Sequence, residues 1–312
     1  MSKAKTFKNG IHPAYNKDLS SKKETVTMPL PQTVTVPLSM HIGAPARPVV
    51  KPRDVVKTGQ LIAEPGGFIS AAVHAPISGK IKAIQPAEHP MGKRAEAIII
   101  ESDGEDTWIE LSPVTNPLEA DRETLIEAVK AAGIVGLGGA TFPSNVKLSP
   151  PPNKPIDFVI LNGAECEPYL TADHRIMLEK ADGIVKGLEI AARILGVDRL
   201  YIGIETNKKD AIKVMQKALG KKGKVIPLDV KYPQGSEKQL ISAVTGREVP
   251  PKNLPMEVGA VVFNVGTAYA IYEAVYEGKP LVERIVTEEN RDRATIMSRI
   301  VEIYSTADPL NA

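Results

Sequence analysis

The chain has 312 residues, with 39 basic and 37 acidic side chains and a formal net charge of +2. A charge so close to zero creates no strong field, so we expect no nucleic-acid partner. No apolar stretch reaches the roughly 18 to 20 residues that span a bilayer, and no secretory signal opens the chain, so we expect a soluble or peripheral protein without a transmembrane segment. The single cysteine, Cys166, excludes an internal disulfide and is typical of a reducing compartment.

Residues 1–30 form a basic N-terminal segment. Its first 24 residues contain six lysines against only Asp18 and Glu24. A solvated tail is the expected structure for such a composition, and contact with anionic lipid heads or with a partner protein is the alternative.

Residues 31–112 predict a small all-β domain built from short β-rich runs. The runs are separated by three turn signals: Gly59-Gln60, Gly66-Gly67 and Ser78-Gly79. The segments 55–63 and 75–81 resemble the barrel-sandwich of lipoyl and biotinyl carrier domains. Those carriers hold a modified lysine at a hairpin tip, whereas no lysine stands between Glu64 and Val73 here. We therefore expect a structural or partner-binding barrel, not a carrier.

Residues 118–280 predict an α/β domain. Asp121 is placed to cap a helix that Gly133 ends. Beyond it, predicted strands and helices alternate, which is typical of a mostly parallel sheet with helices on both faces. The predicted strands are 156–161, 200–205, 225–230 and 260–265. The predicted helices are 176–195, 209–219, 236–244 and 268–276.

The most informative motif is the run Gly-Leu-Gly-Gly-Ala-Thr-Phe-Pro-Ser-Asn-Val-Lys at 136–147. Its glycines, Gly136, Gly138 and Gly139, allow the backbone to approach a ligand closely and to present N–H groups to a phosphate. Lys147 adds a cation at the end of the run. The run has neither the strand-first setting of a dinucleotide fingerprint nor the Gly-Lys-Ser/Thr ending of a triphosphate loop. On its own it indicates only a turn, so its interpretation depends on a second motif.

The second motif, Asn-Gly-Ala-Glu-Cys-Glu-Pro-Tyr at 162–169, directly follows the predicted strand 156–161. It concentrates the amide of Asn162 and the carboxylates of Glu165 and Glu167 at the carboxyl end of that strand. Open α/β sheets bind their ligands at this edge, so the motif predicts a binding site.

Together the two motifs resemble the flavin site of the NADH-oxidising subunit of respiratory complex I. They are more closely similar to the RnfC family of the Rnf electron-transport complex, whose Asn-Gly-Ala-Glu-Cys-Glu-Pro stands unchanged at 162–168. The family's Gly-Ser-Glu-Lys-Gln-Leu stretch stands at 235–240, and its Val-x-Asn-Val-x-Thr stretch at 262–267. Gly-Ile-His-Pro at 10–13, with Lys17, is similar to the opening of the family. The resemblance covers roughly residues 7–287.

The resemblance implies FMN and NAD(H) as cofactors. Gly136, Gly138 and Gly139 would allow the backbone to approach FMN, and Lys147 would meet its phosphate or another anionic part. A surface turn with a solvated lysine is the alternative for these residues. Phe142 would line the nucleotide-binding face, although a lone Phe is usually part of a core.

Polar side chains at the ends of the later strands are further implied cofactor contacts. Asn162 and Asn264 would hydrogen-bond the flavin ring or its ribityl chain, with a helix cap as the alternative for each. Glu237 and Thr267 are weaker matches, and a helix cap is again the alternative.

Glu165 and Glu167 are the implied catalytic pair. They would position the nicotinamide beside the flavin without transferring a proton, and a structural salt bridge is the alternative. Ala164 stands where complex I relatives carry an acidic residue, which is a departure from their pattern. Cys166 is expected to pack as a small apolar residue. The five histidines have no zinc-binding spacing, so we expect no metal site.

The function implied by the resemblance is that of an electron-transfer subunit in a membrane-associated, ion-translocating ferredoxin:NAD oxidoreductase. The protein would lie peripherally on the cytoplasmic face of a bacterial membrane, beside the other Rnf membrane and iron–sulfur subunits. Two alternatives are a relative of flavin-dependent cobalamin reductases and a non-catalytic docking subunit.

One departure concerns the iron–sulfur clusters of the family. Its members continue into cysteine-rich motifs, and each [4Fe–4S] cluster needs four thiolates. With Cys166 alone we expect this chain to bind no cluster. Residues 281–312 are predicted to form a divergent C-terminal segment with a helix-like tail.

Overall fold

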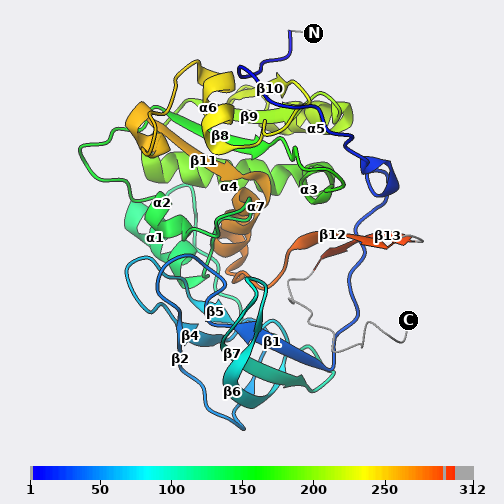
Figure 1. Cartoon of the computed structure of the whole chain (residues 1–312). Helices are drawn as coiled ribbons and strands as arrows, with labels where there is room; N and C mark the ends of the chain where they lie inside the picture. Colours follow the sequence, from blue (N-terminus) through cyan, green and yellow to red (C-terminus); the bar gives the residue numbers. More distant parts are fainter. Residues whose placement is uncertain (1–2, 291–292, 299–312) are drawn as a thin grey trace.

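The computed structural model describes residues 3–290 and 293–298. Figure 1 shows an α/β domain above a smaller β domain, with the N-terminal segment running down one side of both. In the part of the chain that is described, no helix combines the length and the apolar character that a membrane span requires.

The β domain is a sandwich of two antiparallel sheets, as the sequence predicts, with strand orders β1-β7-β6-β3 and β2-β4-β5. Its strands are β1 Thr33–Pro37, β2 Arg47–Pro48, β3 Val55–Val56, β4 Leu61–Glu64, β5 Val73–His74, β6 Gly79–His89 and β7 Lys93–Ser102. Val34 and Val36 pair with Ile100 and Ile98, and all four are buried. They share one face because side chains alternate along a strand, which places them between the two sheets.

The α/β domain contains a four-stranded, fully parallel sheet of order β10-β9-β8-β11. Its strands are β8 Phe158–Gly163, β9 Leu200–Glu205, β10 Lys224–Leu228 and β11 Ala260–Asn264. Its helices are α1 Arg122–Ala131, α2 Ser144–Lys147, α3 Ala172–Glu179, α4 Ala181–Leu195, α5 Lys209–Leu219, α6 Glu237–Thr245 and α7 Val265–Tyr272. Short 3-10 helices are η1 Lys17–Leu19 and η2 Pro255–Val258, and a π-helical turn, η3 Glu273–Glu277, continues α7.

Helices cover both faces of this sheet, which confirms the predicted architecture. Val159 and Leu161 of β8 belong to the core that α4, α5 and α7 cover, whereas Ile160 packs with Leu240 of α6 on the other face. The strand is therefore apolar at consecutive positions, as expected for a parallel strand buried on both sides.

The order of the strands reverses between β8 and β11. The chain passes outward from β8 through β9 to β10 and then returns to β11 on the other side of β8. In this pairing Asn162 and Asn264 are direct partners at the carboxyl ends of the two strands. Such a reversal is the place where open α/β sheets bind ligands, because the connecting loops diverge there.

Three predictions of local structure are wrong. The expected helix 176–195 is two helices, α3 and α4, because the backbone of Lys180 between them leaves helical geometry (φ −132°). In place of a helix-like tail, strands β12 Ile285–Asn290 and β13 Arg293–Ser298 pair antiparallel; residues 299–312 lie outside the described part. Cross-strand pairing replaces the helical pattern that these residues suggest when taken alone.

The N-terminal segment is not a solvated tail, which is the third correction. Lys5 N donates to Pro227 O (2.8 Å), and Ile11 N donates to Tyr232 O (2.9 Å). The segment thus adds backbone hydrogen bonds along the edge of the α/β domain, beside β10 and α5 in Figure 1. A charge count cannot reveal these bonds, since the backbone makes them.

A glycine allows helices α4 and α7 to pack closely. A Cβ added at Gly187 of α4 would lie 1.7 Å from Ala268 O of α7. We expect Gly187→Ala to lower the free energy of unfolding by about 3 kcal/mol, because a backbone atom cannot yield to the new methyl group. Denaturant titration would measure the change.

Gly183→Ala is the matched control on the same helix. Its added Cβ would meet the ring edge of Tyr269 at 2.7 Å, and a side chain can move aside. Both variants gain the higher helix propensity of alanine, about 1 kcal/mol. An equal loss of stability in the two variants would show that the close crossing at Gly187 is not the cause.

Candidate functional site

The glycine-rich loop closes on itself and is held by Thr267 of α7 and by Arg284. Gly136 N donates to Phe142 O (2.9 Å), which ties the two ends of the loop together. Leu137 N donates to the hydroxyl of Thr267 in α7 (2.9 Å), and Leu137 O accepts from the Arg284 guanidinium (2.7 Å). The loop therefore has a defined position at the reversal of strand order.

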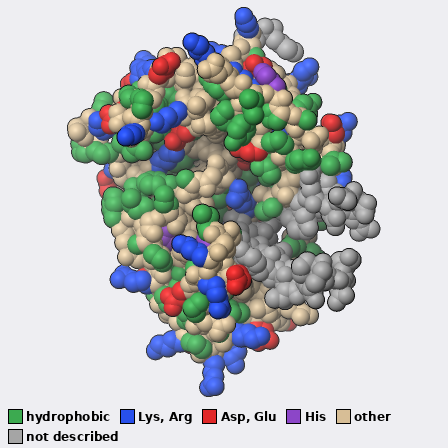
Figure 2. All heavy atoms as spheres, in the orientation of Figure 1, with side chains coloured by type: hydrophobic (Ala, Val, Ile, Leu, Met, Phe, Trp, Pro, Cys, Tyr) green, Lys and Arg blue, Asp and Glu red, His purple; other side chains and the backbone are tan. Residues whose placement is uncertain are grey.

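Two of its glycines have different surroundings. A Cβ at Gly138 would lie 3.0 Å from the Cβ of Asn264, a tight contact, so any larger residue would press against the end of β11. Gly139 has φ +145°, and a Cβ there would meet nothing within 4 Å. The backbone at Gly139 thus borders open space. In Figure 2, a hollow near the middle of the face in view is lined mostly by backbone and uncharged polar atoms.

Asn162 and Asn264 have their polar atoms engaged within the protein. Asn162 Nδ2 donates to Gly235 O (2.7 Å), and its Oδ1 accepts from Ala164 N (3.1 Å). Asn264 Oδ1 accepts from the N–H of Gly266 at the start of α7 (2.8 Å), and its Nδ2 donates to Asp173 Oδ2 (2.6 Å). Asn264 is therefore the N-cap of α7, and the prediction that it also contacts a flavin stays a prediction.

Lys147 and Glu237 come together although 90 positions separate them. Lys147 Nζ lies 2.7 Å from Glu237 Oε1, and the ammonium group stands 5.5 Å from the centre of the Phe263 ring. Both side chains are partly exposed, so the pair borders solvent. Glu237 and Lys147 thus form one charged edge of the site, beside Gly235 and Asn162.

Glu165 is buried and lies on a strained backbone. Its φ is +48°, in the left-handed region that non-glycine residues rarely adopt. Glu165 Oε1 accepts from Asp173 N (2.7 Å), and Lys17 Nζ lies 4.0 Å from its Oε2. Burial, together with the nearby Asp173 carboxylate, raises the pKa of Glu165 to about 8. Burial also raises the pKa of Asp173 to about 6, against the hydrogen bond from Asn264.

The other predicted residues differ in their exposure. Glu167 is exposed, Phe142 is half-buried and Thr267 is fully buried. Glu167 therefore presents its carboxylate to solvent, whereas Thr267 acts on the loop through Leu137. Cys166 is buried, and burial raises the pKa of its thiol to about 11. Cys166 thus carries no thiolate near neutral pH and packs as a small residue, as predicted.

Three charged residues of the site were missed by the sequence argument: Asp173, Lys17 and Lys208. Lys208 is buried, with Nζ 3.0 Å from Glu205 Oε2 and 2.7 Å from Ala164 O. Asp173 lies in the first turn of α3, and Lys17 comes from the N-terminal segment. Of these three residues, only Lys17 could have been found from the sequence, because it follows the Gly-Ile-His-Pro pattern at 10–13.

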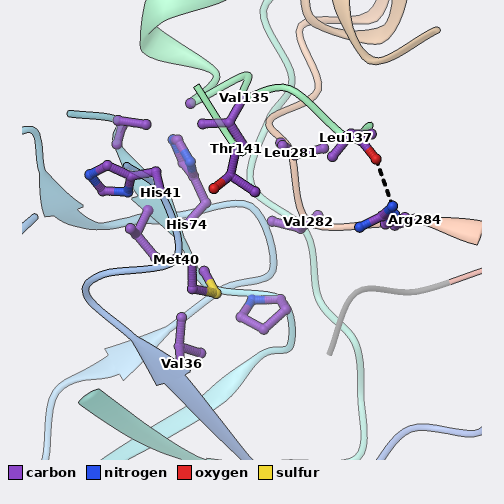
Figure 3. Close-up of a pocket in the computed structure, with 15 residues that line it drawn as sticks. Val36, Met40, His41, His74, Val135, Leu137, Thr141, Leu281, Val282 and Arg284 are labelled. Atoms are coloured by element: carbon purple, nitrogen blue, oxygen red, sulfur yellow. Dashed lines mark hydrogen bonds between the residues drawn. The ribbon is translucent and has the colours of Figure 1, made fainter. Parts of the chain in front are cut away.

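The back of the glycine-rich loop rests against the β domain. Figure 3 shows a cavity of about 140 Å³ at this junction, with His41 and His74 on one side and Val135, Leu137 and Thr141 on the other. Burial lowers the pKa of His74 to about 4, so its ring is neutral at pH 7. The lining of the cavity is mostly apolar, and Val135, Leu137 and Thr141 form the part of it that belongs to the loop region.

The raised pKa values predict how stability depends on pH. A carboxyl group with a folded pKa above its ordinary value of 4.5 stabilises the fold below pH 4.5, and this contribution is lost as pH rises through the folded pKa. We therefore expect the free energy of unfolding to fall between about pH 4.5 and 8 because of Glu165. Glu165→Gln should remove most of this fall in denaturant titrations at pH 5, 6.5 and 8.

Glu248→Gln, at an exposed position outside the site, is the control. A Glu165→Gln protein whose stability falls with pH as steeply as that of the control would contradict the assignment.

Comparison with known proteins identifies both domains. Residues 5–105 match the family described as the RnfC barrel sandwich hybrid domain. Residues 129–273 match the family described as the Nuo51 FMN-binding domain. These matches agree with the β sandwich and with the parallel α/β domain of the structure.

Three relatives, each the C subunit of its complex, extend the similarity over most of the chain. The relative from the proton-translocating ferredoxin:NAD(+) oxidoreductase complex of Clostridium ljungdahlii is 50% identical, over 91% of this chain and 62% of that protein. The relative from the Na(+)-translocating complex of Acetobacterium woodii is 49% identical, over 90% of this chain and 64% of that protein. The relative from the ion-translocating oxidoreductase complex of Rhodobacter capsulatus is 46% identical, over 90% and 55% respectively.

The chain thus spans between about half and two thirds of the length of these relatives. The motifs at 136–147, 162–168 and 235–240, the order of the two domains and the identity with these relatives lead to one conclusion: the chain belongs to the RnfC family.

Proposed function

We propose that this chain binds FMN at the glycine-rich loop and exchanges hydride with NAD(H), as the electron-transfer subunit of an ion-translocating ferredoxin:NAD oxidoreductase. The observation that carries the proposal is the loop itself, which is clamped at Leu137 and borders open space at Gly139. The match of residues 129–273 to an FMN-binding domain and the names of the relatives support it. The match of residues 5–105 favours the Rnf assignment over a cobalamin reductase.

The residues around the loop fit a flavin nucleotide. Gly139 leaves a bare backbone beside open space, and such a backbone can approach a planar ring or a phosphate; Gly138 lets the loop pass close to Asn264. Lys147 provides a cation at the rim for an anionic group, and Glu237 holds its ammonium in place at 2.7 Å. FMN, when bound, supplies a two-electron acceptor that can release its electrons singly.

The protein's part in this chemistry is to position the reactants and to exclude water. Thr267 and Arg284 hold the loop through Leu137, and Asn162 and Asn264 shape the two neighbouring turns. These hydrogen bonds preorganise the floor of the site before any ligand arrives. Direct contacts of either asparagine with the flavin are part of the proposal.

We assign the two carboxylates of the motif different roles. Glu167 is exposed and is the candidate for positioning the nicotinamide, whereas Glu165 is buried among charged groups and supports the motif from below. Phe142 is half-buried beside Gly136 and is the candidate for lining the nucleotide face. The chain would act at the cytoplasmic surface of the membrane, in contact with the other subunits of its complex.

FMN titration tests the binding site. We expect the purified chain to bind FMN and Gly139→Leu to weaken binding at least tenfold, because the new side chain would enter the open space that the ligand needs. Quenching of flavin fluorescence measures the affinity.

Gly196→Leu is the matched control. Gly196 also has a positive φ and nothing near an added Cβ. However, it is the C-cap of α4 and precedes the start of β9, so it lies at the amino ends of the strands, away from the candidate site. Equal affinities of the Gly139→Leu and Gly196→Leu proteins would mean that the loop is only a turn. A wild-type chain that binds no FMN would favour a docking subunit.

Reduction by NADH tests the role of Glu167. We expect Glu167→Gln to slow anaerobic bleaching of bound flavin by NADH about tenfold, because an interaction with the nicotinamide would be lost, while FMN stays bound. Stopped-flow absorbance would follow the reaction. Wild-type reduction kinetics in this variant would exclude the role, and Glu248→Gln should behave as the wild type.

A further inference from the structure

The loop at 164–170 has a backbone that needs outside support. Glu165 and Tyr169 both have positive φ, +48° and +69°, and neither is glycine. Such conformations are unfavourable for L residues and persist only where the surroundings hold them. The loop belongs to no helix or strand, so its support has to come from side chains and from neighbouring segments.

Two buried lysines supply this support through the carbonyl groups of the loop. Lys17 Nζ donates to the carbonyls of Glu167 (2.9 Å) and Leu170 (2.5 Å). Lys208 Nζ donates to the carbonyl of Ala164 (2.7 Å). Hydrogen bonds from charged donors are stronger than neutral ones, so these contacts restrain the loop more than ordinary turn bonds would.

Lys17 differs from Lys208 in its origin. Lys208 belongs to the α/β domain itself, whereas Lys17 belongs to the N-terminal segment, about 150 positions before the loop. The segment is fixed on both sides of Lys17. Tyr15 O accepts from Tyr169 N (2.8 Å), and Ser20 Oγ accepts from the hydroxyl of Thr171 (2.7 Å).

Burial of Lys17 is costly and calls for a specific reason. Only 4% of the residue is exposed, while Lys3, Lys8, Lys22 and Lys23 of the same segment are exposed. Removing an ammonium group from water is unfavourable unless it is paired and hydrogen-bonded. Here its partners are two carbonyls and the Glu165 carboxylate at 4.0 Å, all of them in the loop.

We propose that Lys17 is a positioning residue for the nicotinamide-handling loop, so that the N-terminal segment is part of the nucleotide site. The role in nicotinamide binding rests on the function proposed above. Lys17 fixes the backbone of Glu167 through its carbonyl and thereby sets the direction of the exposed Glu167 side chain. The α/β domain does not complete this site by itself.

Hydrogen exchange of the ligand-free protein tests the restraint directly. We expect Lys17→Met to speed exchange of the Tyr169 and Leu170 amides at least tenfold, because both carbonyl contacts and the neighbouring charge are lost. Lys17→Arg keeps the charge and should lie between Lys17→Met and the wild type. Lys8→Met, at an exposed position of the same segment, should leave the exchange of both amides unchanged.

Flavin reduction by NADH then tests the functional consequence. We expect Lys17→Met to raise the NADH concentration for half-maximal reduction about tenfold, while the affinity for FMN changes less than threefold. A purely structural role would weaken FMN binding as much as NADH binding, and that result would overturn the proposal. If Lys17→Met does not fold, the same comparison is made with Lys17→Arg.

The two experiments separate this inference from the proposed function. A wild-type chain that binds no FMN would contradict the proposed function, while faster exchange in Lys17→Met would still support the restraint of the loop by Lys17. Unchanged exchange in Lys17→Met would overturn the proposal, whatever the flavin experiments show.

Discussion

The pairing of β8 with β11 is the constraint on which the rest of the site depends. It places Asn162 beside Asn264 and so brings together the turns that follow the two strands. The cap that Asn264 forms starts α7, and α7 carries Thr267, whose hydroxyl holds the glycine-rich loop. A segment from residue 136 and one from residue 267 thus meet because two parallel strands pair in one register. The open space beside Gly139 is a consequence of this convergence.

The charges beneath the site are the second organising feature. Glu165, Glu205, Lys17 and Lys208 are all buried around the carboxyl ends of β8 and β9. Buried ion pairs are weak evidence for stability, because the cost of desolvation can exceed the attraction. Here the ammonium groups also bind backbone carbonyls of the 164–170 loop. The arrangement is better explained by the need to hold a strained loop than by a gain in stability.

The two domains meet at the glycine-rich loop. Ile42 N of the β domain donates to Thr141 O (3.4 Å), while Arg284, from the segment that follows the α/β domain, binds Leu137 O. A Cβ at Gly133 would lie 2.3 Å from Ala72 O, so the domains also approach closely at the start of the loop. The β domain carries Phe68, 84% exposed, in the hairpin connection where carrier domains hold their modified lysine. In this structure the β domain contacts the glycine-rich loop through Ile42.

The sequence by itself determined the β domain, the α/β domain and the alternation of strands and helices, and it indicated the motifs of the candidate site. Local signals suffice for these features, because apolar runs, glycines and capping residues determine the conformation of the backbone around them. The N-cap that Asp121 forms at the start of α1 is an example. Tertiary structure alone decided that Lys147 meets Glu237, that Asn264 binds Asp173, and that Lys17 enters the site. It also divided the expected helix 176–195 at Lys180 and paired β12 with β13. These features arise from contacts between residues far apart in the chain, which no local pattern encodes.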